Sequence, residues 1–119
     1  TNVLSMQTFG KKGEDLACSF LQSHGYEIVV RNFRHKKSEI DVICRKDNLL
    51  VFVEVKTRRS VEFGFPEEFV SQNQQKAIIR AAENYVIEHA WKGDIRFDIV
   101  AVLINKETTD IEHLKDAFY

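Results

Sequence analysis

Two polar motifs on either side of a hydrophobic segment hold the side chains best suited to chemistry. Asp41 ends the triplet Glu-Ile-Asp at residues 39–41. Glu54 and Lys56 end the segment 49–56, which is otherwise almost continuously apolar. Side chains two apart on a β-strand share one face, so Glu54 and Lys56 are expected to project together. If Asp41 lies on the neighbouring strand, two carboxylates and an ammonium group meet at one rim of a sheet.

This group of charges predicts a divalent-metal site. Buried ions cost several kcal/mol each, roughly, unless something compensates them. Mg²⁺, with Mn²⁺ as a substitute, binds one or two carboxylates, keeps waters and accepts phosphate oxygens. It would polarise a phosphoryl group and lower the pKa of a bound water, while Lys56 would orient that water or stabilise developing charge. The backbone carbonyl of Val55 is a candidate further ligand.

A structural alternative competes with this interpretation. Lys56 would then form a salt bridge with Asp41 or Glu54 at the end of the strand. For an isolated Glu-x-Lys the salt bridge is the better explanation. The upstream acid, the hydrophobic strand and the hairpin spacing favour the metal site here.

Hydrophobic periodicity predicts the elements that must position these residues. Residues 1–119 fit one α/β domain of order αβββαβ. The expected elements are helices at 8–24 and 71–90, strands at 26–33, 39–45, 49–56 and 96–104, and a short edge strand at 111–114. Thr8 and Ser71 are the expected N-caps and Gly25 the C-terminal stop of the first helix. Short links predict an antiparallel meander for the first three strands, and the helical crossover predicts a mixed sheet.

Composition limits the class of protein. The chain is 44% hydrophobic and 29% charged, the balance of a soluble globular protein. No apolar stretch approaches the roughly 18 residues that would span a membrane, and the isolated Cys18 and Cys44 predict a reducing cytoplasm. The net charge is −1, yet residues 1–60 hold 11 Lys/Arg against 7 Asp/Glu, whereas residues 61–119 hold 6 against 11. A basic half of this kind suits contact with phosphates.

A series of motifs extends over nearly the whole chain, from Gly10 to Phe118. They are Gly13-Glu14 with Ala17, residues 31–34, 39–43 and 51–58, Phe63-Gly64, Ala81-Ala82 and residues 96–98. In these motifs the sequence resembles the PD-(D/E)XK nuclease superfamily, which includes restriction enzymes and archaeal Holliday-junction resolvases. More closely, it is similar to the YraN-like family of small, uncharacterised bacterial proteins.

The resemblance implies a restriction endonuclease-like fold, a central mixed sheet flanked by helices, with Asp41, Glu54 and Lys56 as the site. It also implies that Glu14 completes the metal site, that the partner is nucleic acid, DNA in the first place, and that the protein forms a homodimer. The alternative for Glu14 is an acid in the first turn, favoured by the helix dipole. Gln74 stands where the family usually has Lys, and by helical spacing it is expected to face the site as a polar contact.

Basic residues near the site are candidates for binding a nucleic-acid backbone. They are Arg34, Lys36 and Lys37 in a turn after the first strand, and Arg58 and Arg59 just past Lys56. A solvated turn explains the first group equally well. Three further expectations are structural: an ion pair between Arg96 and Asp98, core-edge positions for His24 and His89, and a loop pinned to the core by Phe63, Phe65 and Phe69.

The sequence therefore predicts a Mg²⁺-dependent nuclease that cleaves nucleic-acid phosphodiester bonds. A nucleic-acid-binding module on a nuclease scaffold, without catalytic turnover of its own, is the alternative. The trio of Asp41, Glu54 and Lys56 favours the enzyme, and the Gln at position 74 favours the module.

Overall fold

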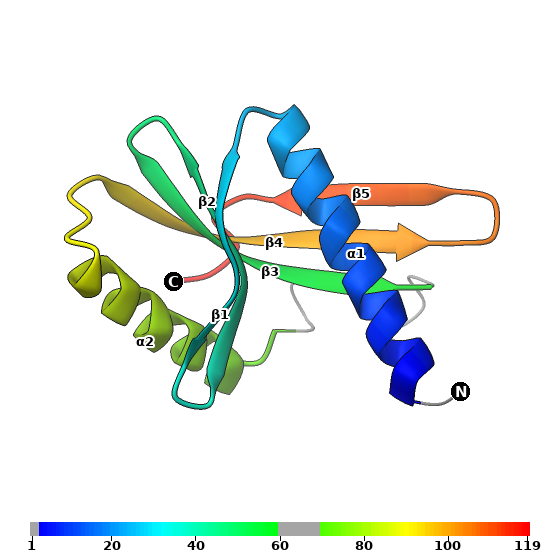
Figure 1. Cartoon of the computed structure of the whole chain (residues 1–119), viewed down its shortest axis with the longest axis horizontal. Coiled ribbons are helices and arrows are strands. Elements are labelled where there is room, and N and C mark those ends of the chain that lie inside the picture. The colour runs from blue at the N-terminus through cyan, green and yellow to red at the C-terminus, as the bar shows by residue number, and fades with distance from the viewer. Residues whose placement is uncertain (1–2, 60–69) are drawn as a thin grey trace.

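The protein is a mixed sheet with one helix packed on each face (Figure 1). The computed structural model describes residues 3–59 and 70–119, with side chains from residue 8 onward. The elements are α1 Val3–Ser23, β1 Glu27–His35, β2 Ser38–Lys46, β3 Leu49–Arg58, α2 Gln72–Glu88, β4 Asp94–Ile104 and β5 Thr109–Leu114. The strands follow the order β1-β2-β3-β4-β5, and the pair β3–β4 is parallel while the other pairs are antiparallel. The predicted α/β class, the meander and the mixed sheet are confirmed, and β5 is the predicted edge strand.

Strand β3 explains why the sheet is covered on both sides. Leu50 and Phe52 belong to the core cluster that α2 closes, whereas Val51 and Val53 belong to the cluster that α1 closes. A continuously apolar strand is stable only where both faces are buried. Each such side chain contributes about 1.5–3 kcal/mol by leaving water. By the same alternation, Glu54 and Lys56 lie on the α2 face of β3.

The helix ends agree with the sequence at two of three predicted positions. The Ser71 hydroxyl accepts a hydrogen bond from the Gln74 backbone N–H at 3.1 Å and caps α2. Gly25 has a φ of 91°, and the next residue, Tyr26, donates its N–H to the Leu21 carbonyl at 3.0 Å to close α1. The predicted N-cap at Thr8 is wrong, because α1 begins at Val3. Residues 3–7 contain neither Gly nor Pro, so the helix extends through them.

The first hairpin is tighter than the sequence predicts. β1 continues to His35 and β2 begins at Ser38, so Lys36 and Lys37 alone form the turn. Lys36 has a φ of 56°, in the left-handed region that disfavours residues with a side chain. The predicted turn over residues 34–38 is therefore too long. The aromatic residues Phe63, Phe65 and Phe69 lie outside the described residues.

Strands β2 and β3 separate near the predicted site. Their ladder ends at the pair Val42–Val53, whereas the β3–β4 ladder continues to Arg58 and Leu103. At the same level of β1, Asn32 has a φ of 55°, and the β1–β2 hairpin bends away from β3 beyond it (Figure 1). The separation opens a notch in the sheet next to Asp41. Within the described residues, no helix is long and apolar enough to cross a membrane.

Candidate active site

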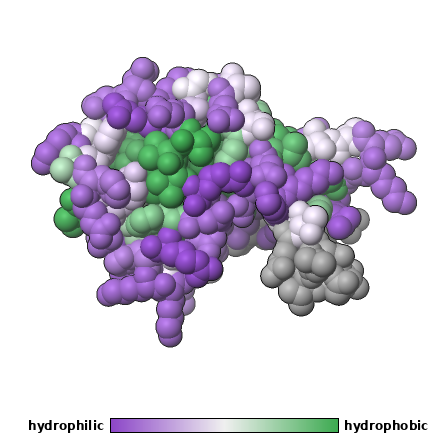
Figure 2. Space-filling view, viewed as in Figure 1, coloured by the Kyte–Doolittle hydropathy of each residue, from purple (hydrophilic) through white to green (hydrophobic). Residues whose placement is uncertain are grey.

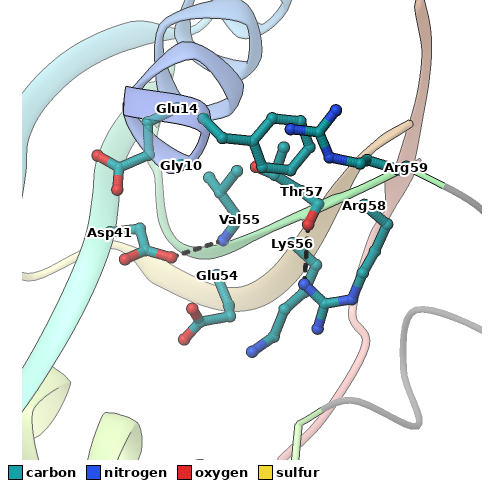
Figure 3. Close-up of a pocket in the computed structure, with 10 residues that line it drawn as sticks. Gly10, Glu14, Asp41, Glu54, Val55, Lys56, Thr57, Arg58 and Arg59 are labelled. Carbon is teal, nitrogen blue, oxygen red and sulfur yellow. Dashed lines mark hydrogen bonds between the residues drawn. The ribbon is translucent and has the colours of Figure 1, made fainter. Parts of the chain in front are cut away.

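The Asp41 side chain replaces a missing sheet partner at the notch. Its Oδ2 accepts a hydrogen bond from the Val55 backbone N–H at 2.8 Å. β2 no longer supplies a carbonyl to β3 at this level, so without Asp41 this donor would need another acceptor. The carboxylate is thereby held beside the end of β3, next to Glu54 and Lys56, as the sequence predicts (Figure 3).

Glu54 is a buried acid, with only 7% of its surface exposed. The Gln74 side-chain amide donates a hydrogen bond to Glu54 Oε2 at 3.2 Å, which is the inward contact expected of Gln74. The pKa of Glu54 is raised to about 9, first by burial and then by a hydrogen bond with Asp41 and the charge of Asp41, while the charge of Lys56 opposes the shift. Without a cation, Glu54 is therefore protonated at neutral pH.

Glu14 reaches the same region from α1. Its pKa is raised by burial and by the charge of Asp41, while Arg31 and Asn32 act in the opposite direction. With its amide nitrogen turned toward the acids, Asn32 donates to Glu14 at 3.2 Å and to Glu39 at 3.0 Å. Because α1 begins at Val3, Glu14 lies beyond the first turn, so the helix-dipole explanation of this acid is wrong.

The acids and several cations line one cavity of about 480 Å³. In Figure 3 the carboxylates of Glu14, Asp41 and Glu54 lie on one side, and Arg58 and Arg59 lie on the other. Two sides of opposite charge can hold a cation and a phosphate next to each other.

Contacts between α1 and β3 fix the depth of this cavity. A Cβ atom on Gly13 would overlap the Thr57 hydroxyl, so glycine is required where the helix crosses the strand. Farther along, the Arg59 guanidinium lies 4.3 Å from the centroid of the Phe9 ring. A cation–π contact of this kind keeps Arg59 extended along the wall of the cavity.

The donor set has the chemistry that Mg²⁺ requires, since all three acids offer hard carboxylate oxygens. The raised pKa values of Glu54 and Glu14 show that the fold itself does not stabilise the charged forms of these two carboxyl groups. Among the described residues, however, no three His, Cys, Asp or Glu side chains are grouped so as to hold a metal ion. Asp41, Glu54 and Glu14 thus fit a metal chemically, and closing around it requires a shift of side chains. The Val55 carbonyl as a ligand stays a prediction.

The basic residues predicted to bind nucleic acid divide into two groups. Arg58 and Arg59 line the cavity with the acids. Lys37 lines a second cavity, of about 250 Å³, together with Asp41, Glu54 and Gln74. Arg34 is instead paired with Glu39 at the surface, with Nη2 3.0 Å from Oε2, and it lines neither of these cavities.

A second buried acid, Asp98, forms the predicted ion pair with Arg96. Two guanidinium nitrogens donate to its two oxygens, both at 2.8 Å. His113 lies 2.7 Å from Oδ2, and the Asp116 backbone N–H donates to Oδ1 at 3.0 Å. Burial alone would raise the pKa of Asp98, but the hydrogen bonds from His113, Arg96 and the backbone together lower it. This network ties β4 to β5. His24 and His89 are exposed and not at the core edge as predicted, but each ring has a hydrogen-bond partner, the Phe20 carbonyl at 2.8 Å and the Tyr85 carbonyl at 3.0 Å.

Several site residues were missed by sequence reasoning. Phe9 and Thr57 line the cavity, and Asn32 and Glu39 surround Glu14. Asn32 carries a usable signal, because asparagine is among the few residues that adopt positive φ readily. Nothing in the spacing of the others marks them, since they come together through the packing of α1 and the bend of the hairpin.

Together the fold and the site define an α/β protein in which the buried Glu54 lies beside the partly buried Asp41 and Glu14, at a notch between two strands. The model of the uncharacterised protein family UPF0102 matches residues 13–102, and the chain belongs to this family. It is 47% identical over 110 residues to a UPF0102 protein of Flavobacterium psychrophilum and 44% identical over 110 residues to one of Christiangramia forsetii, with 92% of both chains covered in each case. A UPF0102 protein of Caldicellulosiruptor saccharolyticus is 43% identical over 118 residues, covering 97% of this chain and all of the relative. These names assign no reaction.

Proposed function

We propose that this protein is a Mg²⁺-dependent nuclease that hydrolyses phosphodiester bonds in nucleic acid on a restriction endonuclease-like scaffold. The observation that carries the proposal is the notch between β2 and β3. There Asp41 caps the Val55 N–H at 2.8 Å next to the buried Glu54 and next to Lys56. The helix-covered mixed sheet supports the same scaffold.

Each residue has a role that follows from its position. Asp41 and Glu54 would hold the metal, with Glu14 approaching from α1. Bound Mg²⁺ would polarise the phosphoryl group and lower the pKa of a water. Lys56 lies on the same strand face as Glu54, where it would orient the attacking water and stabilise negative charge on the phosphate. Arg58 and Arg59 would neutralise phosphate oxygens across the cavity.

A second candidate is a nucleic-acid-binding module without turnover of its own. It is favoured by a protonated Glu54 bound to Gln74 and by the lack of a ready-made metal group among the described residues. In this case the acids would be structural, and the cations alone would contact the nucleic acid. The predicted homodimer and cytoplasmic location stay predictions under either function.

Cleavage assays with matched variants test the nuclease. Labelled single-stranded, duplex and branched DNA and RNA are incubated with Mg²⁺ or Mn²⁺ and the unaltered protein, Asp41→Asn, Glu54→Gln or Lys56→Met. Asparagine at position 41 keeps an oxygen for the Val55 N–H but removes the charge, so the fold is preserved. We expect each variant to lose roughly 100-fold or more of the cleavage rate.

Exposed residues away from the notch serve as controls. Glu83→Gln on α2 and Lys92→Met beyond it change charge by the same amounts at exposed positions, and both should cleave like the unaltered protein. Cleavage that persists in Glu54→Gln and Lys56→Met would refute the site. Binding without cleavage of any of these substrates would favour the module.

A further inference from the structure

A separate basic cavity lies at the tip of the β1–β2 hairpin. It has a volume of about 330 Å³ and is lined by His35, Lys36, Lys37, Ser38 and Arg80. The hairpin supplies four of these side chains and α2 supplies Arg80. Figure 1 shows the hairpin tip next to α2, and Figure 2 shows hydrophilic surface over this end of the molecule. Every lining side chain can donate a hydrogen bond, and three of them carry a fixed positive charge.

This hairpin cavity connects with the acids through shared residues. Lys37 and Ser38 also line the 250 Å³ cavity that contains Asp41 and Glu54. Asp41 and Glu54 in turn line the 480 Å³ cavity that ends at Arg58 and Arg59. The three cavities thus adjoin one another through shared lining residues, and together they form a path with acids in the middle and cations at both ends.

Such an arrangement of charge suits a chain of phosphates. A phosphate placed at the acids would leave the next phosphates of the same strand to meet cations on either side. Arg34 does not contribute here, because it lines none of the three cavities and pairs with Glu39 at the surface. Lys36 and Lys37 lie in the exposed two-residue turn, where their ammonium groups can reach a phosphate.

We infer that the hairpin cavity binds a backbone phosphate of the nucleic-acid strand whose neighbouring phosphodiester lies at Asp41 and Glu54. The inference rests on the proposed function and deepens it: the strand continues on both sides of the acids, so the bond attacked is internal. Arg80, on α2, is the residue that this assigns anew. The hydroxyl of Ser38 and the imidazole of His35 supply the remaining donors.

The backbone at Lys36 offers a variant that does not threaten the fold. Its φ of 56° is disfavoured for lysine and suits glycine, so Lys36→Gly relieves strain while removing the charge. Arg80 is an exposed residue of α2, and alanine is the best helix former there. A loss of binding in these two variants therefore cannot be ascribed to unfolding.

The test measures binding of a fluorescently labelled single-stranded oligodeoxynucleotide by anisotropy in EDTA, where neither metal nor cleavage takes part. We expect Lys36→Gly and Arg80→Ala each to weaken binding about 3- to 10-fold at low salt. Each should also lower the slope of log K against log salt by about 0.7. Lys36→Arg, which keeps the charge, and Lys92→Ala, at an exposed position beyond the far end of α2, should bind like the unaltered protein.

A neutral methylphosphonate placed at one linkage after another locates the contact. We expect one linkage at which the methylphosphonate weakens binding by the unaltered protein but does not weaken binding by the double variant Lys36→Gly and Arg80→Ala. Unchanged binding by both single variants, equal effects of every linkage on both proteins, or no measurable binding by the unaltered protein at low salt would each overturn the inference.

The outcome separates this inference from the nuclease itself. Cleavage that depends on Glu54, with binding unaffected by Lys36→Gly and Arg80→Ala, would reject the phosphate subsite and keep the enzyme. Weakened binding in these variants, with no cleavage of any substrate, would reject the enzyme and keep the subsite.

Discussion

The buried carboxyl of Glu54 should make the stability of the metal-free protein depend on pH. Its pKa rises from 4.5 to about 9 on folding, first through burial and then through Asp41. Between these values the folded chain keeps a proton that the unfolded chain releases. The free energy of unfolding therefore falls as pH rises. The stabilisation is complete below pH 4.5 and is lost as pH rises through about 9.

The size of the effect follows from one proton. A difference of one bound proton gives a slope of about 1.4 kcal/mol per pH unit, or about 4 kcal/mol between pH 5 and pH 8. Glu14 adds a smaller slope of the same sign, because its pKa is also raised by burial and by Asp41. Asp98 acts outside this range: its pKa lies below 3.8, so its contribution is lost only as pH falls below that value.

Urea unfolding in EDTA across this pH range measures the slope. Glu54→Gln keeps the shape of the side chain and an oxygen for the Gln74 amide but cannot ionise. We expect this variant to lose most of the slope and to be more stable than the unaltered protein above pH 8. Glu83→Gln, at an exposed position on α2, should leave the slope unchanged.

Two results would refute the reasoning. A slope retained in Glu54→Gln would show that another group binds the proton. A Glu54→Gln variant less stable than the unaltered protein at pH 7, on a flat pH profile, would show that Glu54 is ionised in the fold and paired with Lys56.

Three further predictions follow from other contacts. Mg²⁺ should raise the melting temperature more at pH 8 than at pH 6, because bound carboxylates must be deprotonated; a shift retained in Asp41→Asn would exclude these acids as ligands. Gly13→Ala should lower the free energy of unfolding by about 1–3 kcal/mol through overlap with Thr57. Adding Thr57→Ala to this variant should restore part of the lost stability, and an unchanged urea midpoint in Gly13→Ala would contradict the contact. Asp98→Asn should lower the free energy of unfolding by about 3–5 kcal/mol, because it leaves the Arg96 guanidinium without its carboxylate. A loss below about 1 kcal/mol in urea unfolding, the value of a surface ion pair, would show that solvent screens this pair.

The elements predicted from sequence are those whose signals are local. Ser71 caps α2 with its own hydroxyl, and Gly25 ends α1 because it tolerates a positive φ. The short link between β2 and β3 and the apolar run of β3 depend on neighbouring residues alone. The pairing of Arg96 with Asp98 is local too, since both lie on one face of β4.

The features of the site that could not be predicted from the sequence arise where elements distant in the chain pack against each other. The bend at Asn32 and the end of the β2–β3 ladder decide that Asp41 faces Val55 rather than a strand partner. The pairing of Arg34 with Glu39 likewise requires the observed hairpin register. A run of basic residues in a sequence gives no means of separating a paired cation from one that faces a cavity.

The two buried acids of this sheet differ in a way that supports the proposed role of Glu54 in binding a cation. Asp98 is surrounded by donors, from Arg96, His113 and the backbone, and these lower its pKa despite complete burial. The fold can therefore compensate a buried carboxylate with its own residues. Glu54 has a neutral amide from Gln74 and a second acid as neighbours, the charge of Lys56 only partly opposes their effect, and its pKa rises to about 9. Under the proposed function, this carboxyl is retained at a cost in stability because an external cation completes the site.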